Sequence, residues 1–126
     1  MSELNERHFP GRAPIEAYGA GGFRFADMSH RGSILALPSG IWAWPPKSAA
    51  EIDEASLERV FAEKAEIDIF LIGCGRDPVL LPARLREHLR EAGISFDVLP
   101  TRAAASTYNV LLGEGRRVAA ALIAVE

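Results

Sequence analysis

Three short stretches of the sequence carry side chains that could bind a ligand or a partner. They are Gly73-Cys74-Gly75 with Arg76, Thr101 with Thr107-Tyr108-Asn109, and the pair Trp42 and Trp44. Glycines let backbone amides approach an anion, a thiolate can act as a nucleophile, and hydroxyl, amide and indole groups can hold a polar partner. The chemistry on offer is therefore anion binding, thiol chemistry or recognition of a partner.

The glycine-rich run from Gly73 to Gly75 follows a nearly continuous β-branched and aromatic stretch, residues 67–72, which is typical of a central strand covered on both faces. Open α/β sheets bind ligands at the carboxyl ends of parallel strands, so this run marks the best candidate cleft. A helix beginning near Pro82 could add its positive end. A dinucleotide site is rejected, because a third glycine and an immediate helix are missing. We favour the plainer alternative, a tight strand exit that needs small residues.

Cys74 is the single cysteine of the chain, and it suits a reducing compartment. It could act as a nucleophile if a helix end or Arg76 stabilised its thiolate. The pattern places none of the three histidines, His8, His30 and His88, beside it, so we favour a packing role. Because no cluster of histidines and acids has metal-ligand spacing, we expect no metal and no cofactor.

The stretch around Thr101 predicts a helix for which Thr101 is a good N-cap. Tyr108 belongs to the apolar stripe of this helix, and such a residue is more often part of the core than of a site. Thr107, Tyr108 and Asn109 are nevertheless three consecutive hydrogen-bonding side chains. Asparagine is a poor helix former, so we expect the amide of Asn109 to have a partner.

Trp42 and Trp44 alternate with smaller apolar residues in a stretch of period two. This period predicts a strand with both tryptophans on one face and Ile41 and Ala43 on the other. We favour burial of the tryptophans in the core, and the alternative is an exposed aromatic patch for a protein partner.

Composition limits the class of protein. The chain has 126 residues, 48% of them hydrophobic and 25% charged, with a formal net charge of −3, which argues against a general affinity for nucleic acid. No stretch approaches the roughly 20 apolar residues needed to cross a bilayer. Without a signal or transit pattern, the expected location is cytoplasmic, or peripheral to the inner membrane through partners. We expect a flexible leader at 1–14 and a single domain at 15–126.

The elements that must position these residues follow from the periodicity. Strands are predicted at 22–25, 33–37, 41–44, 67–72, 94–99 and 117–125, and helices at 53–64, from Pro82 to Gly93, and from Thr101 to Gly113 or Gly115. Alternating strands and helices predict a single α/β domain in which helices flank a mixed central sheet. The glycine-rich N-terminal strands add to that sheet or form a second, smaller one, and the last strand can run in either direction.

The chain resembles a known family through an ordered set of motifs. They are Ala17-Tyr18-Gly19-Ala20-Gly21-Gly22-Phe23, Gly32-Ser33, Pro38-Ser39-Gly40 with Trp44, Leu71-Ile72-Gly73-Cys74-Gly75, Thr101 through Thr107-Tyr108-Asn109, and residues 114–122. The sequence is similar to a bacterial member of the Mth-type domain family, which includes mitochondrial complex I assembly factor 3 and the adipogenesis-associated Mth domain proteins. The resemblance implies an α/β fold and supplies no catalytic residues.

Two functions remain open at this point. The resemblance implies a non-catalytic module that binds proteins, such as respiratory-complex subunits or assembly factors, during complex I assembly. The alternative is a small-molecule or anion-binding domain, or an enzyme, that uses the strand-end cleft at Gly73 to Gly75. The sequence leaves the oligomeric state open.

Overall fold

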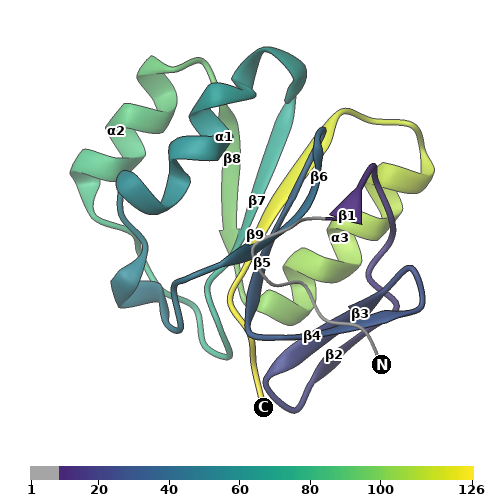
Figure 1. The fold of residues 1–126 in the computed structure, drawn as a ribbon. Coiled ribbons are helices and arrows are strands. Elements are labelled where there is room, and N and C mark those ends of the chain that lie inside the picture. Colours follow the sequence, from purple (N-terminus) through teal and green to yellow (C-terminus); the bar gives the residue numbers. More distant parts are fainter. Residues whose placement is uncertain (1–8) are drawn as a thin grey trace.

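The computed structural model describes residues 9–126 (Figure 1). The strands are β1 (Phe9–Pro10), β2 (Ala17–Gly19), β3 (Gly22–Phe25), β4 (Met28–Arg31), β5 (Ser33–Leu37), β6 (Gly40–Trp44), β7 (Ile69–Gly73), β8 (Ser95–Leu99) and β9 (Val118–Leu122). The α-helices are α1 (Glu58–Ala62), α2 (Ala83–Glu91) and α3 (Thr101–Gly113), and short 3-10 turns cover Ala49–Glu51, Ala55–Leu57 and Lys64–Glu66. Of the predicted leader, residues 1–8 lie outside the described residues, and Phe9–Pro10 pair with β6.

The central sheet has six strands in the order β1-β6-β5-β9-β7-β8. Strand β7 is parallel to both β8 and β9, whereas β5 is antiparallel to both β6 and β9. The prediction of a mixed sheet in a single α/β domain is therefore confirmed. The last strand, β9, is parallel to β7 on one side and antiparallel to β5 on the other, so both arrangements that the sequence allowed occur. As a result, β6, β7, β8 and β9 all end at the same edge of the sheet.

Helices cover the sheet on its two faces, with α1 and α2 on one side and α3 with the small sheet on the other (Figure 1). Alternation along β6 divides its side chains between them. Trp42 and Trp44 pack on the face of α1 and α2, and Ile41 and Ala43 pack on the face of α3. All five residues of β9 are buried, and the small side chain of Ala120 lies on the face that α3 covers.

The glycine-rich N-terminal part does both things that the sequence allowed. Strands β5 and β6 join the central sheet, and β2, β3 and β4 form a separate three-stranded antiparallel sheet. Phe23 and Phe25 of β3 are buried against the side of the core that α3 covers. The small sheet therefore closes that face of the molecule.

The predicted helix at 53–64 is wrong in its length, because the α-helical part is only Glu58–Ala62 between two 3-10 turns. The cause is a tertiary contact. Trp44 Nε1 donates a 2.7 Å hydrogen bond to the Ser56 carbonyl, which a continuous helix would use as an internal acceptor. Leu57 and Val60 of this segment are fully buried, whereas Lys64 is exposed.

The elements that lead to the candidate site follow the prediction closely. Helix α2 starts directly after Pro82 and buries Leu85 and Leu89, and Gly93 has a positive φ of 78° just beyond its end. Strand β8 brings the chain back parallel to β7 and leads into α3. The crossover therefore places the end of β7 beside the start of α3.

Candidate functional site

The end of β7 and the start of α3 are joined by a reciprocal pair of hydrogen bonds. The Thr101 N–H donates to the Gly75 carbonyl at 2.8 Å, and the Gly75 N–H donates to Thr101 Oγ1 at 3.0 Å. The Thr101 hydroxyl in turn donates to the carbonyl of Ile123, just after β9, at 2.7 Å. One fully buried side chain thus ties three elements together.

This arrangement corrects the prediction that Thr101 is an N-cap. Pro100 occupies the N-cap position, and Thr101 is the first helical residue, with no side-chain cap bond at this end of α3. A threonine at the start of a helix can bond its own helix or reach a neighbouring chain segment. Here the Gly75 N–H is a buried donor and the Ile123 carbonyl is a buried acceptor. The Thr101 hydroxyl satisfies both, because it can accept one hydrogen bond and donate another.

The glycines at the end of β7 are required by this junction. A Cβ atom at Gly73 would lie 2.9 Å from Leu122 Cδ2 and 3.0 Å from Thr101 Cα. Gly75 adopts a φ of 109°, a conformation that L-amino acids with a side chain rarely take. Both glycines therefore have structural reasons to be there, which supports the tight strand exit.

The backbone amides of this run are already engaged. The Cys74 N–H donates to the Leu99 carbonyl at 2.8 Å, and the Gly75 N–H points at Thr101. An anion held by these two amides would have to displace protein acceptors. Cys74 itself is buried, and its Sγ lies 3.3 Å from the Asp77 carbonyl, as expected for a small residue packed at a strand end.

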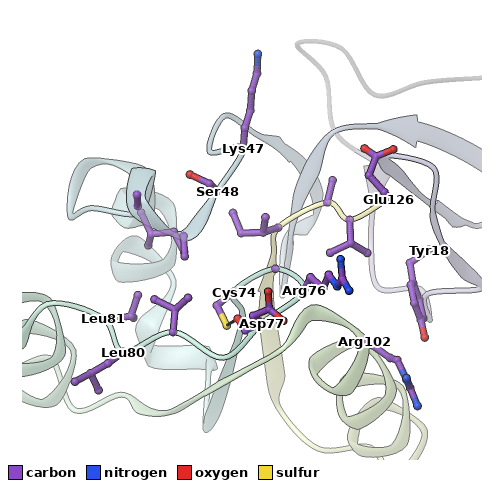
Figure 2. A pocket seen from close by; sticks show the side chains of 18 of the residues that line it. Tyr18, Lys47, Ser48, Cys74, Arg76, Asp77, Leu80, Leu81, Arg102 and Glu126 are labelled. Carbon is purple, nitrogen blue, oxygen red and sulfur yellow. Dashed lines mark hydrogen bonds between the residues drawn. The ribbon is translucent and has the colours of Figure 1, made fainter.

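A cleft of 1040 Å³ lies at the carboxyl edge of the sheet, where β6, β7 and β9 end. Figure 2 shows Cys74 and Asp77 in the middle of its lining, with Leu80 and Leu81 on one side and Tyr18 on the other. Cys74, Gly75 and Arg76, all predicted site residues, line it, and the glycine-rich strand end does adjoin a cleft.

Three cationic residues line this cleft: Lys47, Arg76 and Arg102. Their side chains make no ion pair within the described part of the chain. Two acidic residues, Asp77 and Glu126, line it as well. The cleft therefore offers cations at its wall and apolar surface from residues such as Ile52 and Leu81.

None of the predicted site residues of α3, including Thr101, lines the cleft. The Asn109 amide forms a double hydrogen bond with the backbone of Ile15, accepting from its N–H and donating to its carbonyl, both at 2.8 Å. The amide thus has the partner that its mid-helix position required. The two hydrogen bonds hold the segment before β2 against α3, about 12 Å along the helix from Thr101.

Tyr108 is buried as its place on the apolar stripe predicts, with 1% of its surface exposed. Burial raises the pKa of its phenol to about 12. We expected its hydroxyl to find a hydrogen-bond partner, and none occurs among residues 9–126. Thr107 is half-buried. Within residues 107–109, Tyr108 therefore packs in the core and Asn109 binds the Ile15 backbone, and none of the three residues lines the cleft.

The two tryptophans do not form an exposed aromatic pair. Trp44 is buried, and Trp42 is half-buried under the guanidinium of Arg59, whose Cζ lies 3.4 Å from the ring centroid. Trp42 Nε1 donates to Ser39 Oγ at 3.0 Å. The core alternative therefore holds for Trp44, and its indole N–H stabilises the turn before α1 instead of meeting a partner.

Sequence reasoning missed the most exposed apolar side chains beside the cleft. Leu80 is 77% exposed and Val79 is 43% exposed, and both lie in the proline-flanked loop, residues 76–82, between β7 and α2. The available signal was the run Val79-Leu80-Leu81 between two prolines, too short for a strand and cut off from the following helix. Only Leu81 of this run is buried.

Two features are absent from residues 9–126. No three side chains of histidine, cysteine, aspartate or glutamate gather as metal ligands. No helix in this part of the chain has the length and apolar character to cross a membrane.

Several known proteins are similar to this chain over most of its length. A curated protein of Rhodobacter capsulatus, described as uncharacterized, is 38% identical over 94% of this chain and 90% of its own length. The mouse NADH dehydrogenase [ubiquinone] 1 alpha subcomplex assembly factor 3 is 30% identical over 95% of this chain, which spans 65% of the mouse protein. A crystal structure described as an outer membrane protein of Bartonella henselae superposes with a TM-score of 0.91, at 53% identity, over 94% of this chain and all of that one.

The family prediction is confirmed, since assembly factor 3 is one of the proteins that the resemblance named. The family described as "Protein of unknown function (DUF498/DUF598)" matches residues 15–123, nearly all of the described fold. The chain therefore belongs to the DUF498/DUF598 family.

Proposed function

We propose that this chain is a non-catalytic protein-interaction domain that contributes to assembly of the respiratory NADH dehydrogenase complex. The name of the mouse relative supports the process, and that relative shares the whole fold region with this chain. The partners would be subunits or assembly factors of the complex. The protein would then work in the cytoplasm, or at the inner membrane through those partners.

The observation that carries the proposal is the exposed apolar tip of the proline-flanked loop. Leu80 leaves 77% of its surface in water, although burying a leucine side chain is worth about 1.5 to 3 kcal/mol. Pro78 and Pro82 fix the backbone on either side, so little conformational entropy is lost when a partner covers the tip. The loop also separates two concave sites, because Val79 and Leu80 line both the cleft and a second groove beside β8.

The test is complementation in the host of the gene. After deletion of the gene, the amount of assembled NADH dehydrogenase complex is measured on native gels, with re-expression of wild type, Leu80→Asp or Val110→Asp. Val110 is the matched control, because it is an apolar residue of α3 that is 59% exposed and lies outside the loop. Wild type and Val110→Asp restore the complex, and Leu80→Asp does not.

An unchanged amount of complex after deletion of the gene would contradict the assembly role. Equal restoration by Leu80→Asp and Val110→Asp, at equal levels of folded protein, would show that the loop is not the interaction surface.

The cleft favours a second candidate function, the binding of a small anionic molecule. Lys47, Arg76 and Arg102 have no ion-pair partner in the described part of the chain, and the cleft is large enough for a small-molecule ligand. Thermal shifts with inorganic phosphate and with short carboxylates test this function. A rise in melting temperature that Arg76→Ala and Arg102→Ala abolish would support it, and no rise with wild type would remove it.

A further inference from the structure

Strand β8 forms one edge of the central sheet, since it pairs with β7 on one side and with no strand of residues 9–126 on the other. Its first four residues alternate between exposed and half-buried positions, and Leu99 is half-buried. An edge of this kind presents backbone donors and acceptors that another extended chain can use. What this edge can bind depends on which residues face outward.

The ladder with β7 identifies those residues. The Leu99 carbonyl accepts from the Cys74 N–H, so Leu99 directs its backbone groups toward β7. Along a parallel strand this direction alternates, which turns Ser95 and Asp97 toward β7 and Phe96 and Val98 outward. No described residue hydrogen-bonds the outward N–H and carbonyl groups of Phe96 and Val98. The edge therefore offers two donors and two acceptors.

A groove of 720 Å³ runs along this edge, lined by Phe96 and Val98, by Arg86 and Arg90 of α2, and by the apolar tip of the loop. Phe96 and Val98 are half-buried and pack on the face of α1 and α2. The exposed Leu80 borders the same groove. On this face of the sheet, an added strand would thus meet the apolar side chains of Phe96, Val98 and Leu80 next to the two arginines of α2.

The charge of Asp97 bears on which strands can pair with this edge. Its carboxylate is exposed on the opposite face of β8, and it forms no ion pair with the described residues. A second copy of this chain that pairs antiparallel, with Phe96 opposite Val98, would place Asp97 directly opposite its own copy, with Cα atoms about 4.5 Å apart. Like charges directly opposite each other destabilise a strand pair. The charge of Asp97 therefore disfavours pairing of two copies in this register and favours a strand that places a cation opposite Asp97.

We propose that β8 is extended by a strand from a partner protein that carries lysine or arginine opposite Asp97 and apolar side chains against Phe96, Val98 and Leu80. The inference rests on the proposed function, because the strand comes from a protein partner. It goes further in stating how that partner binds and which residue selects it.

The experiment titrates the purified, isotope-labelled full chain with two capped pentapeptides and follows backbone amides by NMR. The probes are Thr-Ile-Lys-Ile-Thr and Thr-Ile-Glu-Ile-Thr, which differ only in the charge that would face Asp97. The amides of Phe96 and Val98 shift and exchange more slowly with the lysine peptide. This peptide binds at least about fivefold more tightly than the glutamate peptide at low salt.

Two variants complete the design. Asp97→Lys reverses the preference, so that the glutamate peptide binds more tightly. Val98→Pro removes one outward N–H at an edge position that tolerates proline, and it weakens the lysine peptide at least about tenfold while the thermal melt stays cooperative.

Equal affinity of wild type for both peptides, an unchanged preference in Asp97→Lys, shifts that map away from β8, or no shift at millimolar peptide would each overturn the inference. These readouts need only the purified chain. Failure of the peptides to bind is therefore distinct from failure of the chain to support complex assembly.

Discussion

Thr101 and Gly75 hydrogen-bond each other twice, backbone N–H to carbonyl at 2.8 Å and backbone N–H to hydroxyl at 3.0 Å, although 26 residues separate them. The same hydroxyl donates to the Ile123 carbonyl, so one side chain joins the ends of β7 and β9 to the start of α3. Two residues of this junction, Gly75 and Ile123, line the cleft together with residues of the proline-flanked loop. The structural role of the glycine-rich run is thus to connect β7 to the start of α3 beside the cleft.

Replacing Thr101 with valine keeps the shape of the side chain but removes the hydroxyl. The buried Gly75 N–H and Ile123 carbonyl lose their partner, so Thr101→Val is expected to lower the free energy of unfolding by about 1 to 3 kcal/mol. Urea denaturation measures the change. Thr101→Ser keeps the hydroxyl and should cost clearly less, and a larger loss for serine than for valine would contradict this role of the hydrogen bonds.

Gly75→Val places a β-branched residue at a φ of 109°. Such backbone strain is expected to cost about 1 to 3 kcal/mol. Gly113→Ala is the matched control, because it lies at the end of α3 with open space around it and without positive φ. The control should be neutral or up to about 1 kcal/mol more stable in urea melts. Equal stability of the two variants would remove the strain argument.

Asn109→Ala cuts both hydrogen bonds to the backbone of Ile15. Alanine is the better helix former, yet the two lost bonds should outweigh that gain and leave a net loss of about 1 to 2 kcal/mol. Asn109→Asp keeps an acceptor for the Ile15 N–H but sets a second carboxylate oxygen against the Ile15 carbonyl.

The pKa of the new carboxyl should therefore be raised in the folded state, since only its protonated form can donate to that carbonyl. The sign follows: this variant should come closer to wild-type stability below about pH 4 and lose that ground as the pH rises. Melts of both proteins across acidic pH measure the difference, and a constant gap would count against the hydrogen-bond pattern.

Burial raises the pKa of Tyr108 to about 12, which makes the stability of the protein sensitive to alkaline pH. A raised pKa in the folded state favours the neutral phenol, so this contribution is complete below about pH 10 and is lost between about pH 10 and 12. The loss should approach about 2 to 3 kcal/mol in wild type and be absent in Tyr108→Phe. Comparison of the two proteins cancels the other alkaline groups, and parallel stability curves would contradict the prediction.

Local patterns predicted much of this fold because they coincide with tertiary burial. The period of two at Trp42 and Trp44 set the faces of β6, and Pro82 and Gly93 marked the limits of α2 correctly. The interrupted helix at 53–64 escaped prediction for a physical reason. The Trp44 indole N–H takes the Ser56 carbonyl, a contact between segments that no local propensity contains.

The candidate site likewise has features that the sequence predicted and features that it did not. The strand-end position of Gly73 and Gly75 followed from the sequence, because glycine runs after a buried strand have few structural meanings. The partner of the Thr101 hydroxyl did not, since it depends on where Gly75 and Ile123 lie in space. The exposure of Leu80 was also hidden, because an apolar residue gives no sign in sequence that its neighbours leave it uncovered.

The most direct measurement is photo-crosslinking in the host of the gene, with p-benzoyl-phenylalanine in place of Leu80 or, as a control, of Val110. Both sites are exposed apolar positions, and only the first borders the cleft and the groove beside β8. The account predicts that position 80 crosslinks to a subunit or assembly factor of the NADH dehydrogenase complex and that position 110 does not. Equal products at both positions, or products from position 80 that contain no component of that complex, would contradict it.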